Sequence, residues 1–363
     1  MPKYKIFGSE FTASRGNEYE TKSLLYLVSL HKQKKEMYYY LVDVFNDVSG
    51  MSIDGKYIVD VQSKGHKNMS PFQLGERLVT LFKNYISNFN FEDYILVVST
   101  MLSNKHLKMG IDLNKKEYNL ISTINDDALV LCKNGLKEKV ASYSIIKEWI
   151  DITNEDIVDS YIDEFVRKVH IYVADKNKED YVESILGIDN YNDKDLLLDI
   201  FDEIAKHQIF KKSKNSIEGK EVMTPIDTLR FKRHLTNDQI QLLIVKRIID
   251  NEYIANKYAA PRDFIFYLSC HEPKSYHDEI IDKCKDQIAV SLFNRNNRDI
   301  FWQGFMNIYF QVYELYDENR TLDEYYNLLN IEDFEKVLFK NDDYYTKLYI
   351  LAMIIEGVKN DKD

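Results

Sequence analysis

The residues whose types and spacing best suggest chemistry lie between Asp47 and Lys64. Val59–Lys64 is predicted as a β-strand, in which alternate side chains share one face. Asp60, Gln62 and Lys64 therefore point the same way, and Asp47 comes from the preceding strand of a predicted hairpin. Carboxylate and amide oxygens bind hard divalent cations, and a lysine orients water or neutralises developing charge. Metal-dependent phosphodiester hydrolysis requires this combination.

A predicted helix before the hairpin adds a further carboxylate. Asn17 is the predicted N-cap, and the helical pattern runs from Glu18 to about His31. Glu20 lies four residues before Leu24 and therefore shares the inward-facing stripe of this helix. This glutamate, Asp47 and the Gln-x-Lys pair are less expected to occur together by chance than any one of them alone.

Each of these residues also has a plainer explanation. Glu20 complements the helix dipole if it lies in the first turn. Asp47 caps the turn before Ser49 and Gly50. Lys64 discourages aggregation if its strand is at a sheet edge, and Asp60 is equally compatible with a solvent-facing position. We favour metal-dependent phosphodiester hydrolysis, because this one function accounts for all four residues together.

The surrounding elements predict an α/β fold followed by a helical region. Pro71 begins a predicted helix that continues to about Ile86, and residues 94–99 form a continuous apolar strand suited to burial on both faces. Residues 128–132 and 170–173 are candidates for further strands. The first part is thus expected to be an α/β sandwich. We predict two domains, 1–150 and a mainly α-helical 151–363, with 211–222 as the most linker-like segment.

Composition limits the classes of protein that the chain can belong to. Its 363 residues are enough for two domains, and 45% hydrophobic and 29% charged residues are typical of a folded soluble protein. Three scattered cysteines fit a reducing compartment better than a disulfide framework or a zinc site. We expect a cytoplasmic protein, because no apolar stretch is long enough to cross a bilayer and the N-terminus lacks a cleavable signal pattern.

Charge is unevenly distributed along the chain. Residues 1–150 carry 20 Lys+Arg and 17 Asp+Glu, whereas the remainder carries 28 and 42, within a net charge of −11. Because an acidic surface repels phosphate, only the first part is expected to tolerate nucleic acid. An incidental split, common in acidic proteins, is the alternative. The basic segment Arg230–His234 in the acidic part is interpreted as a charged helix face in preference to a nucleic-acid contact.

Motifs of other chemistries are not found. The sequence has no Gly-x-Ser-x-Gly elbow, Walker P-loop, Gly-x-Gly-x-x-Gly turn or His-Glu-x-x-His pair. Over about residues 10–105 the chain instead resembles the PD-(D/E)XK restriction-like nucleases, in the branch where glutamine replaces the second motif acid. The resemblance is carried by Arg15-Gly16-x-x-Tyr19-Glu20, Asp47-Val48 and Asp60-Val-Gln62-Ser-Lys64.

The resemblance implies a restriction-endonuclease-like mixed sheet flanked by helices, and a role for each residue of the site. Asp47 is the principal metal-ligating acid, Gln62 supplies a neutral oxygen where a second acid usually stands, Lys64 is the catalytic lysine and Glu20 supports the metal. The implied cofactor is Mg²⁺, with Mn²⁺ as a possible substitute. Our own inference is that Asp60 is a further metal ligand that restores the charge Gln62 lacks.

The loop after Lys64 has the composition of a phosphate contact. His66, Lys67, Asn68 and Ser70 offer basic and hydrogen-bonding groups next to the predicted helix N-terminus at Pro71, and we predict that they bind DNA. For His66, a solvated loop histidine is favoured over a proton donor.

The whole chain most resembles effector endonucleases of CBASS and Lamassu-type anti-phage systems, in particular the Lamassu effector subunit. This implies double-stranded DNA as substrate, control by an SMC-like ATPase and a small middle subunit through the helical part, and self-assembly into an oligomer when active. A partner ATPase of the HerA type is an alternative, and the catalytic residues alone do not exclude RNA. A catalytically inactive binding or assembly protein on a nuclease fold, with Gln62 as the mark of decay, is the competing function.

Overall fold

The computed structural model describes residues 4–6, 14–65, 69–143, 146–189, 194–213, 216–249, 252–256, 258–339 and 343–362. Contacts within the chain divide it into two compact units. Unit 1 comprises Met1–Asn177 and Ile204–Asn237, and unit 2 comprises Lys178–Glu203 and Asp238–Asp363.

Unit 1 is built on a mixed seven-stranded sheet. The strands follow the order β6-β7-β5-β4-β3-β2-β9, in which β4 pairs parallel with β5 and β5 pairs parallel with β7, while the other neighbours are antiparallel. The mixed α/β architecture predicted from the sequence is thus confirmed. The strands are β2 (Tyr39–Val42), β3 (Val48–Met51), β4 (Ile58–Lys64), β5 (Asp93–Val98), β6 (Glu117–Asn119), β7 (Val169–Val173) and β9 (His234–Thr236).

The predicted domain boundary at residue 150 is corrected by two strands that follow it. β7 pairs with both β5 and β6 inside the sheet, and β9 adds to the edge of the sheet through β2. These pairings join segments far apart in sequence, so no local change in composition marks them. Unit 1 therefore continues to Asn177 and takes up residues 204–237 as well.

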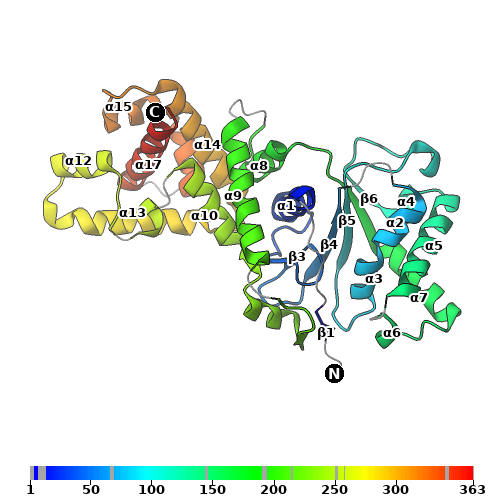
Figure 1. Cartoon of the computed structure of the whole chain (residues 1–363). Helices are drawn as coiled ribbons and strands as arrows, with labels where there is room; N and C mark the ends of the chain where they lie inside the picture. Colours follow the sequence, from blue (N-terminus) through cyan, green and yellow to red (C-terminus); the bar gives the residue numbers. More distant parts are fainter. Residues whose placement is uncertain are drawn as a thin grey trace. The chain divides into compact units, whose positions relative to one another are not determined.

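Helices cover both faces of this sheet (Figure 1). Helix α1 packs against β3 and β4 on one face, and α3 packs against β4 on the other, where α2, α5 and α7 surround it. A hydrophobic core on the α3 side joins Ile58, Leu96 and Phe82 among many apolar residues. The helices of unit 1 are α1 (Ser14–Ser29), α2 (Pro71–Arg77), α3 (Val79–Tyr85), α4 (Leu120–Thr123), α5 (Asp126–Ser142), α6 (Ile146–Trp149) and α7 (Glu155–Lys168), with 3₁₀ turns at Asn104–His106 and Pro225–Phe231.

Two local predictions differ from the observed elements. The helix predicted from Pro71 to Ile86 is divided at Leu78 into α2 and α3. The strand predicted at 128–132 is part of α5, whose first turn is capped by the Asn125 side chain accepting a hydrogen bond from the Ala128 N–H. The apolar run that follows is compatible with a strand or a helix, and the capping residue before it is the local signal for a helix.

The segment 211–222, predicted as a linker, is partly structured. Its first two residues end α9, and β8 (Glu221–Val222) pairs antiparallel with β1 (Tyr4–Lys5). The basic segment Arg230–His234 is not a helix face either. It runs from a 3₁₀ turn into β9, with Lys232 in the left-handed conformation between them.

Unit 2 contains only helices among its described residues, as predicted for the C-terminal part. Helix α9 spans the division between the units at Ile204. None of the described helices combines the length and apolar character needed to cross a bilayer. The remaining helices are α8 (Lys178–Leu186), α9 (Lys194–Lys212), α10 (Asn237–Ile248), α11 (Glu252–Ala255), α12 (Arg262–His271), α13 (His277–Leu292), α14 (Arg298–Leu315), α15 (Leu322–Leu328), α16 (Ile331–Leu338) and α17 (Tyr344–Lys362), with a 3₁₀ turn at Lys274–Tyr276.

Two glycines allow α2 and α5 to touch backbone to backbone. A Cβ on Gly135 would lie 2.1 Å from the Phe72 carbonyl oxygen, and one on Gly75 would lie 1.8 Å from the Cys132 carbonyl oxygen. We expect Gly135→Ala to lower the free energy of unfolding by about 1–3 kcal/mol, since the backbone cannot yield as a side chain does. Urea unfolding measures this, with the exposed Asn134→Ala on the same helix as control; equal stabilities of the two variants would contradict the close packing.

Candidate active site

Asp47 and Gln62 meet across the antiparallel pair β3–β4. Val48 pairs with Val61, so Asp47, just before β3, stands opposite Gln62. The Gln62 Nε2 donates to Asp47 Oδ2 at 2.6 Å, and the same oxygen accepts from the Ser63 N–H at 2.7 Å and the Ser63 hydroxyl at 2.8 Å. The Asp47 carboxylate therefore bonds across the hairpin, instead of capping the turn before Ser49.

Helix α3 covers the face of β4 that carries the predicted site. The Thr80 hydroxyl donates to Gln62 Oε1 at 2.9 Å, which leaves both polar ends of the Gln62 amide hydrogen-bonded. Lys64 is two residues further along the strand and is only partly buried. Because β4 lies between β3 and β5, Lys64 is not on an edge strand, and the anti-aggregation explanation does not apply.

Asp60 is a fully buried carboxylate and not a solvent-facing one. It accepts hydrogen bonds from Asn46 Nδ2 at 2.5 Å, Asn84 Nδ2 at 2.6 Å and the Ser49 hydroxyl at 3.0 Å. Burial raises the pKa of Asp60 to about 6, against the lowering effect of these donors and of the buried Lys83 ammonium. The oxygens of Asp60 are thus engaged by α3, by β3 and by the β2–β3 loop, and its role as a metal ligand stays a prediction.

The pKa of Asp60 predicts how stability depends on pH. Because the pKa of Asp60 is about 6 in the folded protein and 3.8 for an ordinary aspartate, the folded state binds the proton more tightly than the unfolded state. This group stabilises the fold at low pH, and the contribution is lost as the pH rises from about 4 to about 6, by about 3 kcal/mol in all. The Asp60→Asn variant has no titrating carboxyl at this position. The Ser49 hydroxyl can then accept a hydrogen bond from the asparagine amide, where it now donates one to Asp60.

Urea unfolding of Asp60→Asn and wild type at several pH values between 4 and 6 measures this difference. We expect the stability of wild type to fall relative to that of the variant as the pH rises. Parallel stability curves for the two proteins would contradict the raised pKa of Asp60.

Glu20 on α1 is held by a lysine from a distant part of unit 1. Lys212 Nζ lies 3.1 Å from Oε1 and 3.3 Å from Oε2 of Glu20. The Glu20 side chain is 5% exposed and that of Lys212 15% exposed. Since α1 begins at Ser14, Glu20 lies beyond the first turn, and the helix-dipole explanation does not apply.

Asp43 is a further acid near the hairpin, at the start of the β2–β3 loop. The Asp43 N–H donates to the Asp47 carbonyl at 3.1 Å, and the Asp43 carboxylate accepts from Arg233 Nη1 at 2.9 Å. Burial raises the pKa of Asp43, as does the Asp47 charge, and the Lys212 and Arg233 cations lower it. Asp43 itself has a φ of 53°, which places it in the left-handed region at the end of β2.

The structure thus brings part of the predicted site together. Asp47 and Gln62 are in contact, and Glu20 forms an ion pair with Lys212, whose charge lowers the pKa of Asp43. The space that a Cβ on Gly65 would fill is taken by the Tyr19 ring, so the N-terminal half of α1 lies near the end of β4. Among the described residues, no hydrogen bond or ion pair joins the Lys64 ammonium to the other three.

The carboxylates of this conformation do not form a ready cation site. In the described part of the chain, no group of three or more His, Cys, Asp or Glu side chains is arranged to hold a metal ion. Asp47 Oδ2 is occupied by three donors, Gln62 turns its amide nitrogen to Asp47, and Glu20 binds Lys212. As they stand, these contacts do not fit a bound Mg²⁺.

The predicted DNA-binding residues are only partly testable. His66, Lys67 and Asn68 lie outside the described residues. Ser70 is the N-cap of α2: its hydroxyl accepts from the Gln73 N–H at 3.2 Å, while its own N–H donates to Gln73 Oε1 at 3.0 Å. A structural capping box thus accounts for Ser70.

Sequence reasoning did not assign three charged residues to this region, although one of them, Arg233, belongs to the basic segment that was weighed as a nucleic-acid contact. Lys212, at the end of α9, pairs with Glu20, and Arg233, just before β9, pairs with Asp43 in the β2–β3 loop. Asp43 lies four residues before Asp47, and that proximity was the only local signal for it. Nothing in the sequence connects Lys212 with a residue 192 positions away.

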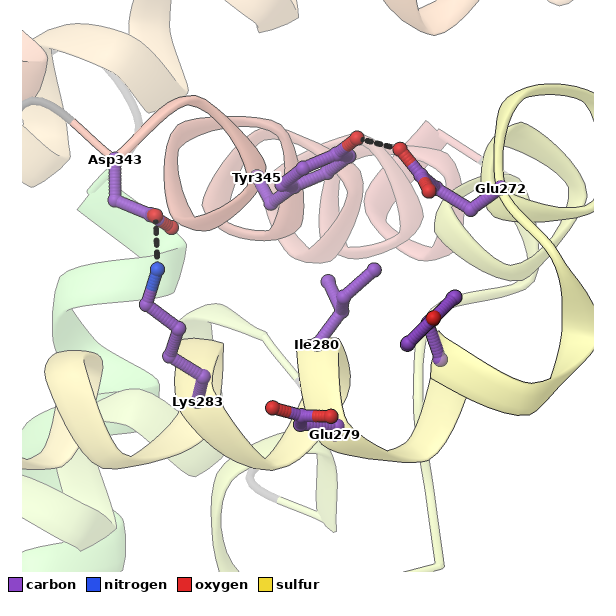
Figure 2. A pocket seen from close by; sticks show the side chains of 7 residues that line it. Glu272, Glu279, Ile280, Lys283, Asp343 and Tyr345 are labelled. Atoms are coloured by element: carbon purple, nitrogen blue, oxygen red, sulfur yellow. Dashed lines mark hydrogen bonds and ion pairs between the residues drawn. The ribbon is translucent and has the colours of Figure 1, made fainter.

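Unit 2 contains a pocket with a volume of about 410 Å³. Figure 2 shows Lys283 paired with Asp343 at 2.6 Å and Tyr345 hydrogen-bonded to Glu272 across it. Among the acids of the lining, only Glu279 is drawn without a hydrogen bond or an ion pair in Figure 2. An exposed carboxylate by itself does not indicate a ligand. The lining residues are Glu272, Tyr276, Glu279, Ile280, Lys283, Asp343 and Tyr345.

Comparison of the chain with protein-family models, with curated proteins and with solved structures found no match.

Proposed function

We propose that the chain is a metal-dependent DNA endonuclease of the PD-(D/E)XK type whose site lies at the end of the β3–β4 hairpin. The observation that carries this proposal is the contact between Asp47 and Gln62 across the hairpin, with Lys64 two residues beyond Gln62 on the same strand. An acid, an oxygen ligand and a lysine in that order are the parts that the resemblance implies. A mixed sheet with helices on both faces supports the same assignment.

The chain's own residues have distinct roles in this proposal. The Asp47 carboxylate supplies the negative charge of the site, and Ser63 and Gln62 fix its orientation by three hydrogen bonds. Lys64, partly exposed at the strand end, neutralises charge that develops on the phosphate. Thr80 orients the Gln62 amide. Asp60 and Lys83 are buried beneath this site, and their role is structural.

Phage defence and partner control belong to the same proposal. A nuclease that cuts cellular DNA is toxic unless it is restrained, and the helical unit 2 offers a surface for regulatory subunits. By the resemblance, these are an SMC-like ATPase and a small middle subunit, and the active form is a homo-oligomer. Light scattering after size-exclusion chromatography, with and without coexpressed partners, measures the assembly.

One observation favours the competing function, a binding or assembly protein on a nuclease fold. The groups of the site satisfy one another: Asp47 binds Ser63 and Gln62, and Glu20 binds Lys212. A decayed site would be expected to close in this way, with the amide of Gln62 no longer available to a cation.

Plasmid cleavage distinguishes the two functions. The full chain, alone and with its partners, is incubated with supercoiled plasmid and Mg²⁺ or Mn²⁺, and EDTA is added in parallel. Nicked or linear product that EDTA abolishes supports the nuclease. A folded protein that leaves plasmid and single-stranded RNA intact under every condition supports the binding protein.

A further inference from the structure

The pocket of unit 2 lies between the end of α12, the first half of α13 and the start of α17 (Figure 2). Its volume of about 410 Å³ falls within the usual range of small-molecule sites, roughly 300–1,000 Å³. In Figure 2, Ile280 lies between the Lys283–Asp343 pair and the Tyr345–Glu272 pair. The pocket thus has charged groups at both ends and an apolar middle.

The only lysine of the lining is already neutralised. Lys283 Nζ lies 2.6 Å from Asp343 Oδ1, and Asp343 Oδ2 accepts from the Thr346 N–H at 3.0 Å and the Thr346 hydroxyl at 2.6 Å. Burial raises the pKa of Asp343, but the hydrogen bonds from Lys283 and Thr346 lower it further, so the pKa lies below its ordinary value. Asp343 therefore caps the start of α17, and its charge and that of Lys283 cancel.

The other two acids of the lining have no cationic partner among the described residues. Glu272 accepts a hydrogen bond from the Tyr345 hydroxyl, and this bond, together with burial, raises the pKa of Tyr345 to about 12. The phenol therefore keeps its proton, and Glu272 keeps its negative charge. Glu279 is exposed on the first turn of α13. Unit 2 as a whole carries 17 Lys+Arg and 32 Asp+Glu, so its surroundings add to the negative charge of the pocket.

These residue types select one class of ligand. Phosphates and other anions are repelled by the charge of the pocket and of unit 2. The acids are not arranged for a metal ion, since the described part of the chain holds no such group of three ligands. An ammonium on an alkyl chain fits: carboxylates bind the charge, while Ile280 and the ring of Tyr276, which is 53% exposed, contact the chain and the cation. The dipole of α13 favours Glu279 in the first turn but accounts for neither the cavity nor its tyrosines.

We propose that this pocket binds a primary ammonium group on an alkyl chain, with Glu272 and Glu279 as its counter-ions and with Ile280 and Tyr276 as walls for the chain. Two sources supply this chemistry: a free diamine or polyamine, and a lysine side chain of a partner protein. The inference does not depend on the proposed nuclease function, because it uses none of the residues of the candidate active site.

Calorimetric titration of the full chain with 1,5-diaminopentane at low ionic strength tests the site. We expect binding at one site per chain, whereas 1,5-pentanediol, the uncharged analogue, should not bind. Glu279→Gln should weaken the binding by about fivefold or more, because a hydrogen bond to a charged group is lost. Glu318→Gln is the matched control: it removes the same charge from an exposed glutamate of unit 2 outside the lining, and affinity should not change. Tyr276→Leu keeps an apolar wall without the ring and should weaken binding by about twofold or more.

A second measurement uses wild-type protein and does not depend on the folding of a variant. A capped tripeptide with a central lysine is titrated in the same way, beside the same peptide acetylated on the lysine Nζ. Tighter binding of the peptide than of 1,5-diaminopentane assigns the site to a lysine of a partner protein, and the reverse order assigns it to a free amine. In both cases acetylation should abolish binding of the peptide.

Three results would overturn the inference. The first is that neither amine binds at a single site. The second is that Glu318→Gln weakens binding as much as Glu279→Gln does, since this would show a general attraction to an acidic protein. The third is that the uncharged diol or the acetylated peptide binds as tightly as its charged counterpart.

Discussion

We expect the Lys64→Ala variant to lose plasmid cleavage by about 100-fold or more relative to wild type, with little change in stability. Lys64 follows Gln62 by two residues at the end of β4, and in the proposed site its ammonium would stabilise charge that develops in the transition state. Its side chain is partly exposed and has no hydrogen bond or ion pair to another described residue, so its removal leaves no buried group without a partner. The measurement is the initial rate of supercoiled plasmid loss in Mg²⁺, normalised to folded protein by circular dichroism.

Lys56→Ala is the matched control for this variant. Lys56 belongs to the turn that precedes β4, is exposed, and pairs with Asp54 at 3.2 Å. It carries the same charge but lies away from Asp47 and Gln62, so its removal should leave cleavage unchanged. A Lys64→Ala protein that cuts as fast as the Lys56→Ala protein would remove Lys64 from the site.

The second large effect is expected for Asp47→Ala, which should both abolish cleavage and destabilise the fold by about 2–4 kcal/mol. The Gln62 amide, the Ser63 N–H and the Ser63 hydroxyl all lose their acceptor, and these residues are almost fully buried. Urea unfolding measures the loss of stability and the plasmid assay measures the activity.

Asp47→Asn separates the two consequences. The asparagine oxygen can still accept from Ser63, while the negative charge is lost. We expect stability close to that of wild type and cleavage as low as in Asp47→Ala. If Asp47→Asn cut DNA at the wild-type rate, Asp47 would be a structural acceptor and not the acid of the site.

The local features of the fold were predictable because they depend on neighbouring residues. The alternation around Asp60 and Gln62 indicates a strand, and Pro71 begins α2 as expected from its missing N–H. The pairing of β7 and β9 with the sheet was not predictable, because strands carry no local mark of their distant partners. For this reason the predicted domain boundary at residue 150 was placed too early in the sequence.

The candidate site shows the same division. Strand alternation correctly places Asp60 and Gln62 on one face, yet α3 separates their environments: Asn84 encloses Asp60, and Thr80 meets Gln62 nearer the strand end. Alternation gives the direction of a side chain and not the depth at which a helix covers it. Lys212 could not be foreseen either, since the contact with Glu20 depends on the path of the whole chain between them.

The central claim is that Glu20, Asp47 and Gln62 converge on one divalent cation. A crystal structure of the chain with Mn²⁺, phased or checked by anomalous scattering, tests it most directly. The account predicts an anomalous peak about 2.0–2.3 Å from oxygens of Asp47, Gln62 and Glu20, with Lys212 moved away from Glu20. Mn²⁺ bound elsewhere, or a saturated crystal in which Lys212 still pairs with Glu20 and the hairpin holds no ion, would contradict it.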